Sequence, residues 1–235
     1  SVDEVIKKRI LEKKDYVEER LKLIYFEKEA ILKNLINFEG ARSDLVGYRD
    51  EDEFALVYPF IPYQFKLLQN VFEQVRKRGS SGKHLSEGER SMLSAFKESA
   101  IQFKDEEEGI LVPFYAFYET IYEFLSPTIT RVIDGAEKNP AFEGDPFSIN
   151  LLKTLFMVKY IDELPANVDN LAVLMATKID EDKIALKERI IKSLNKLLNE
   201  YLIQKNGDVY IFLTDDEQEI NKDIKLTQID ESLIK

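Results

Sequence analysis

The stretch Tyr-Leu-Ile-Gln-Lys-Asn-Gly-Asp-Val-Tyr-Ile-Phe-Leu, residues 201–213, has the pattern of a β-hairpin. Two segments rich in β-branched and aromatic residues, 201–204 and 209–213, flank the polar sequence Lys-Asn-Gly-Asp. The Asn206-Gly207 pair favours a tight turn, because both residue types tolerate the backbone conformations that two-residue hairpin loops require. We therefore predict a small β-hairpin near the C-terminal end of a chain that is otherwise mainly α-helical.

Three predicted helices precede this hairpin. The first covers 147–160, the second is capped by Asn167 after Pro165, and the third begins at Asp180 or Glu181 and reaches Leu202. Three helices followed by a two-stranded wing is the order of elements in a winged-helix domain. The sequence thus predicts a winged-helix-like domain over 148–222, followed by a tail over 223–235.

Many winged-helix domains bind DNA through the third helix, so the charge of that helix bears on function. Lys187 and Lys192 are candidate nucleic-acid contacts. Acidic residues on the same helix and on the wing offset them, which favours a packing or protein-docking role. Weak or partner-assisted DNA contact is the alternative.

A segment rich in glycine and proline, 135–147, separates this region from the residues before it, and we predict that it is a linker. The preceding domain, 1–134, is predicted to be helical. It begins with one long helix over 2–38, or two helices joined near Lys13. A short extended segment is expected over 54–60, then a helix from Pro62 to Gly79. The aromatic-rich segment 113–125 predicts a central core helix.

A second pattern lies in 82–96, Gly-Lys-His-Leu-Ser-Glu-Gly-Glu-Arg-Ser-Met-Leu-Ser-Ala-Phe. Ser86 and Glu89 form a capping box ahead of apolar residues, which predicts a helix beginning near Glu87 and a helical hairpin with the preceding helix. A helix start offers free N–H groups to an anion, and basic residues surround this one. The candidate phosphate-binding residues are Lys83, Ser86, Gly88 and Arg90, and the basic end of the preceding helix adds Arg76, Lys77 and Arg78 as candidate nucleic-acid contacts. The alternative is that Ser86 and Glu89 only cap the helix and that the basic residues are solvated.

Two known phosphate-binding motifs do not fit this stretch. A P-loop requires wider glycine spacing and a hydroxyl where His84 stands. The signature of ABC-type ATPases resembles residues 85–90, but the apolar strand ending in Asp-Glu that should follow is missing.

A longer match covers Tyr-Pro-Phe-Ile-Pro-Tyr-Gln-Phe-Lys-Leu-Leu-Gln at 58–69 together with 82–96. These residues resemble the middle region of the large P-loop ATPases of BREX phage-defence systems, the BrxC/PglY group. The resemblance implies a fragment with a lid-like helical domain, whose parent binds ATP and Mg²⁺ through motifs that this chain lacks. It also implies three kinds of partner: the ATPase domain of the same protein, a neighbouring subunit, and other BREX proteins. No cofactor is expected in the fragment, and whether it is an enzyme stays open.

Composition sets further bounds. The 235 residues carry a net charge of -11, which argues against a general affinity for nucleic acid. The chain has no cysteine, which excludes thiolate chemistry, and only one histidine, which excludes multi-histidine metal sites. The sequence nominates no catalytic residue. The acidic run 105–108 is expected to be a solvated turn and not a metal site. No apolar run is long enough to cross a membrane, and we expect a cytoplasmic protein.

Overall fold

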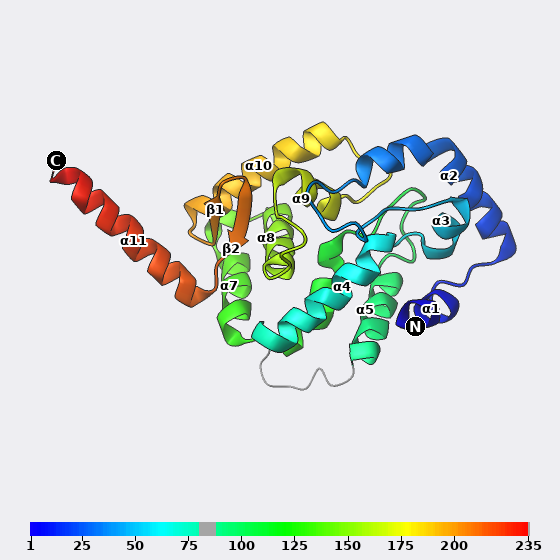
Figure 1. The fold of residues 1–235 in the computed structure, drawn as a ribbon, viewed down its shortest axis with the longest axis horizontal. Coiled ribbons are helices and arrows are strands. Elements are labelled where there is room, and N and C mark those ends of the chain that lie inside the picture. Colours follow the sequence, from blue (N-terminus) through cyan, green and yellow to red (C-terminus); the bar gives the residue numbers. More distant parts are fainter. Residues whose placement is uncertain (80–87, 235) are drawn as a thin grey trace.

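The computed structural model describes residues 1–79 and 88–234 (Figure 1). Its N-terminal part forms two helices, α1 (Val2–Arg9) and α2 (Asp15–Leu35). Of the two arrangements that the sequence allowed, the structure has the pair of helices joined near Lys13. The Lys13 Nζ donates hydrogen bonds to the main-chain oxygens of Leu11 at 3.1 Å and Leu56 at 2.9 Å, which fixes the joint against the following helix.

That following helix, α3 (Glu51–Val57), replaces the extended segment predicted over 54–60. Asp50 caps it by accepting a hydrogen bond from the Glu53 backbone at 2.8 Å, and the acidic first turn suits the positive end of the helix dipole. Phe54 is fully buried between Tyr25 and Tyr48, with ring centroids 5.5 and 4.9 Å away. The prediction was wrong because Pro59 restricts only Tyr58, and the cap that begins a helix at Asp50 was overlooked.

Helix α4 (Pro62–Gln74) begins with Pro62 at its first position, as predicted, and continues into a π-helical turn, η1 (Val75–Gly79). Helix α5 is described over Gly88–Gln102, and its predicted start near Glu87 lies outside the described residues. The two helices pack through Phe65 and Phe96, whose rings stack with centroids 4.5 Å apart. The helical hairpin expected from the sequence is therefore present in the described residues.

The aromatic-rich segment is not the single helix that was predicted. It consists of η2 (Phe114–Phe117), α6 (Tyr118–Ile121) and η3 (Tyr122–Phe124). A continuous helix would have spread its aromatic side chains around the full circumference, whereas the short turns direct Phe114, Phe117 and Tyr118 into the core. Tyr122 stays at the surface, where its hydroxyl donates to Asp134 at 2.7 Å. The expectation that this segment is central to the core is confirmed for its buried members.

The segment 135–147, predicted to be a linker, is helical and packed. Helix α7 (Pro127–Lys138) runs into it, η4 (Pro140–Phe142) follows, and α8 (Pro146–Val158) begins at its end. Ala136 and Phe142 are buried in a core that also contains residues of both predicted domains. Glycine and proline here mark helix boundaries and turns and do not mark an unpacked connection.

Helices α9 (Val168–Met175) and α10 (Lys183–Asn199) follow, and Asn167 caps α9 as predicted. The hairpin consists of β1 (Ile203–Asn206) and β2 (Val209–Phe212), paired antiparallel with Asn206 opposite Val209. The turn is therefore Gly207-Asp208 rather than Asn206-Gly207, and Gly207 adopts a φ of 64° that favours glycine. Helix α10 ends at Asn199, before the predicted Leu202, and β1 begins at Ile203, two residues later than expected, so Lys205 and Asn206 belong to the strand and not to the turn.

The predicted tail is helical. Helix α11 (Asp215–Leu233) projects from the body of the molecule at the end opposite α2 (Figure 1). Thr214 caps it, and Lys159 of α8 holds its first turn through an ion pair with Glu217 at 3.0 Å. The Lys159 side chain is 5% exposed and also donates to the main-chain oxygen of Phe212, so one lysine joins α8, β2 and α11.

Two further contacts unite the sequence-distant parts of the chain. Residues 109–111 pair with 177–179, with the Leu111 backbone donating to Thr177 at 2.9 Å. Asn170 of α9 bonds both main-chain groups of Glu39. The described residues are thus mainly helical with one small antiparallel sheet, which confirms the predicted fold class at that level.

Candidate anion-binding and docking surfaces

The basic end of α4 is exposed. Arg76, Lys77 and Arg78 lie on η1, after the buried Val75, and their side chains point to solvent. The guanidinium of Arg78 lies over the ring of Tyr160, 5.3 Å from its centroid. Figure 1 shows the end of α4 and the start of α5 at the same edge of the molecule. The structure therefore places three of the predicted basic residues at the same edge of the molecule as the first described turn of α5.

The residues predicted to touch a phosphate are only partly described. Lys83 and Ser86 lie outside the described residues, so the capping box does too. Gly88 and Arg90 lie in the first turn of α5, whose backbone the structure describes. The apolar positions that follow are confirmed: Met92 and Phe96 are buried, and Leu93 packs against the core. The helix that was predicted after this start is present, while the start itself and its interaction with an anion stay predictions.

The lysines of α10 do not form a free basic surface. Lys187 pairs with Asp169 at 2.5 Å, and Lys183 donates to the main-chain oxygen of Asn34 at 2.8 Å. Lys192 is exposed. On the same helix Ile184 is 74% exposed and Ile191 is 45% exposed. The accessible surface of α10 is therefore mixed in charge and partly apolar, which suits contact with a protein better than contact with phosphates.

A buried polar network lies where the linker was predicted. Asp145 caps α8 and accepts hydrogen bonds from the Ser148 hydroxyl and the Lys196 ammonium, each at 2.5 Å. Ser148 also bonds the hydroxyl of Ser193 at 2.9 Å. Burial opposes ionisation of Asp145, but the hydrogen bonds from Lys196 and Ser148 outweigh it and hold the pKa of Asp145 below its usual range. Both serines are buried, and Asp145 and Lys196 are partly exposed, so the network joins α8 to α10 from the core to the surface.

The pH dependence of folding should report this network. Because its pKa is lower in the folded state, Asp145 stabilises the fold above its unfolded pKa near 3.8, and that contribution is lost as pH falls through the folded value. Asp145→Asn keeps a capping side chain but removes the charge, so we expect it to lower the free energy of unfolding at pH 7 by about 1–3 kcal/mol. Urea unfolding at pH 7 and pH 3 checks this. The deficit should shrink at pH 3, and the exposed Asp208→Asn should show no comparable loss at pH 7. An equal deficit at both pH values contradicts the assignment.

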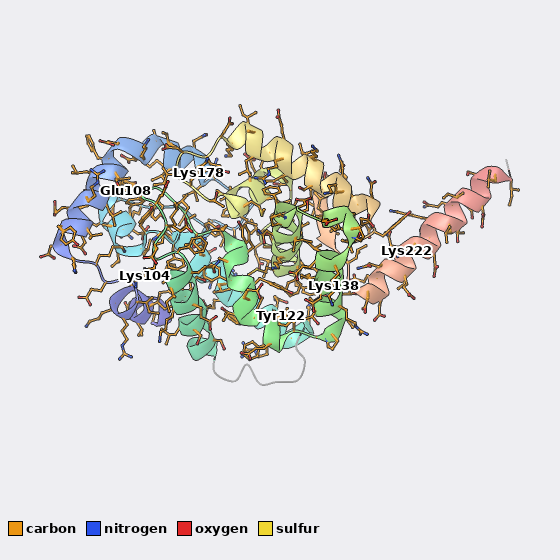
Figure 2. The ribbon with its side chains drawn as sticks, turned by 180° about the vertical axis from the view of Figure 1, so that it is seen from behind. Lys104, Glu108, Tyr122, Lys138, Lys178 and Lys222 are labelled. Carbon is orange, nitrogen blue, oxygen red and sulfur yellow. The ribbon has the colours of Figure 1, made fainter. Side chains whose placement is uncertain are left out.

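A groove of about 490 Å³ lies between the α1–α2 joint and residues 100–110. Lys13, Tyr58 and Phe103 line it, and Arg20 spans its rim to Glu108 at 3.0 Å. Figure 2 shows Lys104 and Glu108 at this end of the molecule. Burial lowers the pKa of Lys13 to about 8. Its two main-chain hydrogen bonds nevertheless assign it a structural role, because one acceptor, Leu11, lies in the α1–α2 joint and the other, Leu56, lies in α3.

Within residues 1–79 and 88–234, no group of three or more acidic, histidine or cysteine side chains is arranged to hold a metal ion. The acidic run 105–108 lies on the surface beside the groove, where Glu108 pairs with Arg20. No helix in this part of the chain combines the length and apolarity needed to cross a bilayer.

One feature of α2 was not predicted. The sequence assigned its apolar stripe to Val17, Leu21, Ile24, Ile31 and Leu35. Leu23 and Phe26 lie off that stripe, and the structure leaves both exposed beside the buried Tyr25. The sequence did contain a signal for this exposed feature, namely two large apolar residues three positions apart on the polar side of a predicted helix. Comparison with known proteins adds no assignment to any of these surfaces, since no protein-family model and no solved structure matches the chain significantly.

Proposed function

We propose that the chain is a non-catalytic regulatory and assembly segment of a BREX-like P-loop ATPase involved in phage defence. One observation carries the proposal. The two stretches with the most specific resemblance to that family, 58–69 and 82–96, are separated by 12 residues, and their described residues pack together. The ring centroid of Phe60 lies 5.0 Å from that of Phe96, and Phe65 stacks on the same ring at 4.5 Å. Contact between the two stretches supports the idea that they form one structural unit.

The proposed role of this unit is to present the start of α5 to a nucleotide phosphate. Such a phosphate would be held by the ATPase domain of the same protein or of a neighbouring subunit, together with the parent's Mg²⁺. Free helix N-terminal amides and an arginine one turn into the helix suit an anion. Arg90 has that position in α5, and Arg76 to Arg78 add positive charge at the same edge. In this role the helical part of the chain acts as a lid, and Lys83, Ser86 and Gly88 complete the proposed contact.

The C-terminal part is proposed to be winged-helix-like and to dock proteins. The order α8, α9, α10, β1, β2 supports the first point, and the exposed Ile184 and Ile191 of α10 support the second. Other BREX proteins in the cytoplasm are the proposed partners. DNA is the less favoured partner because Lys187 is paired with Asp169.

A reconstitution experiment tests this function. The chain alone should not hydrolyse ATP above background, since phosphoryl transfer needs a phosphate cradle and a held Mg²⁺ that its sequence does not supply. Joined to the P-loop domain of a BREX ATPase of the same type, it should change ATP turnover or nucleotide-dependent assembly. An ATPase domain that turns over and assembles identically with and without the chain would contradict the proposal.

A nucleic-acid-binding module is the second candidate, and the exposed cluster Arg76, Lys77 and Arg78 favours it. With a net charge of -11, we expect duplex and single-stranded DNA to bind more weakly than about 10 μM at 150 mM salt. Fluorescence anisotropy at 50 and 150 mM salt measures this. Tight, steeply salt-dependent binding that is lost on replacing all three residues by alanine, and kept on replacing Lys222 and Lys225, would establish the alternative.

A further inference from the structure

Helix α2 exposes two large apolar side chains next to each other. Leu23 is 61% exposed and Phe26 is 83% exposed, and residues three apart on a helix are neighbours on its surface. They lie on the side of α2 that faces away from the core formed by Leu21, Leu32 and Leu35. Figure 1 shows α2 at the outer edge of the molecule, next to α3.

These side chains border a groove of about 310 Å³ between α2 and α3, here called the α2 groove. It is lined by Glu19, Lys22, Leu23, Tyr25, Phe26, Glu29 and Glu51. Tyr25 is 3% exposed, and its hydroxyl has no hydrogen-bond partner among the described residues. A buried, unpaired hydroxyl is unfavourable, so it marks a place where a polar group from another molecule would be accommodated.

The charge of the α2 groove is predominantly negative. Three carboxylates line it, and its one lysine, Lys22, is paired with Asp52 of α3 at 3.3 Å. Glu29 pairs with Lys33 at 2.7 Å in the next turn of α2. Glu19 and Glu51 add negative charge on either side of the groove. An apolar surface with an acidic rim selects a ligand that combines a cation with aliphatic surface.

We propose that the α2 groove docks a protein segment that presents an arginine beside an aliphatic side chain. A guanidinium group stacks on an exposed aromatic ring and bonds carboxylates in the same plane, which an ammonium group does less well. Phe26 supplies the ring, Glu51 supplies a carboxylate, and the Tyr25 hydroxyl accepts a further N–H. Leu23 packs against the aliphatic neighbour. This surface is separate from the α5 start and does not depend on the function proposed for it.

A peptide titration tests the proposal with the full chain. The probe is acetyl-Leu-Arg-Leu-amide, followed by amide chemical shifts of the labelled protein, with acetyl-Leu-Glu-Leu-amide as its charge-reversed counterpart. We expect saturable shifts centred on α2 and α3 with the arginine peptide, and binding at least about tenfold weaker with the glutamate peptide. Phe26→Ser should weaken binding about fivefold or more. Ile220→Ser, which removes a comparably exposed residue on α11, should leave binding unchanged.

Tyr25→Phe separates docking from a purely structural role of this tyrosine. Removing the unpaired hydroxyl should leave the urea midpoint of the free protein unchanged or higher, yet weaken the arginine peptide about two- to fivefold. Absence of saturation up to about 20 mM peptide, equal binding of the two peptides, or full binding by Phe26→Ser would each overturn the proposal. Sedimentation tests the remaining possible occupant of the groove, which is a second copy of the chain. Self-association that is lost in Phe26→Ser would show that a second copy of the chain occupies the groove, and would also overturn it.

Discussion

Arg90→Ala is expected, under the function proposed above, to lower the ATP turnover of the chain joined to a BREX-like P-loop domain by about tenfold or more, which is the scale of other phosphate-contacting arginines. The reason is the position of Arg90 near the start of α5. Arg90 lies in the first turn of α5, the part of a helix that favours an anion, and a planar guanidinium can form two parallel bonds to phosphate. Steady-state ATP hydrolysis by the assembled protein is the measurement.

A matched control is available on the same helix. Lys97 is exposed on α5 beyond its first two turns, so Lys97→Ala removes an equal charge away from the helix start and should leave turnover within about twofold. The melting temperature of the isolated chain should be nearly the same for both variants. If Arg90→Ala unfolds the chain while the surviving protein turns over normally, the arginine is a structural brace and the phosphate contact is refuted.

Asn170→Ala is expected to be among the most destabilising single substitutions in the C-terminal part. The Asn170 side chain is fully buried, donates to the main-chain oxygens of Glu39 at 2.9 Å and Pro165 at 2.8 Å, and accepts from the Glu39 backbone at 2.7 Å. Alanine would leave three main-chain groups without these partners. Because Glu39 lies near the surface, water recovers part of the loss, and we expect a decrease of about 2–4 kcal/mol in the free energy of unfolding.

Urea unfolding monitored by circular dichroism measures this loss. Asn195→Ala on α10 is the control, because it removes the same amide from an exposed position and should change stability by less than about 0.5 kcal/mol. Equal unfolding midpoints for the two variants would mean that the contact between Glu39 and α9 contributes little to stability. A loss in Asn170→Ala that exceeds the control by the expected margin would confirm that α9 anchors the 36–40 segment.

Local signals in the sequence predicted the elements whose ends are encoded by a few neighbouring residues. Pro62 begins α4, Asn167 caps α9, and the 201–213 pattern forms the hairpin. Elements set by tertiary packing were not predicted. The packed state of 135–147 depends on Lys196, 51 residues away along the chain, reaching Asp145, and this partner is not visible from local sequence. Helix α3 had a local signal in the Asp50 cap, but the packing of Phe54 on Tyr25 of α2 is again a contact that local sequence does not show.

The candidate site followed the same rule. The presence of α5 could be predicted because apolar spacing acts locally. The pairing of Lys187 with Asp169 could not be predicted, since it depends on how α10 packs on α9. The α2 groove was not predicted for a different reason. Its sequence signal was present, but Leu23 and Phe26 indicate a groove only when they are seen beside the buried Tyr25 and the carboxylate of Glu51 from α3.

The length of α11 and its attachment at one end determine how far its C-terminal end moves when its base tilts. Its 19 residues are attached at one end, where Lys159 holds Glu217, and none of them is buried. At about 1.5 Å per residue the helix is about 28 Å long, so a tilt of about 10° at its base displaces its far end by about 5 Å. The ion pair between Lys159 and Glu217 therefore lies at the base of α11. A sub-ångström shift between α8 and β2 at this base would displace the C-terminal end of α11 by a distance several times larger.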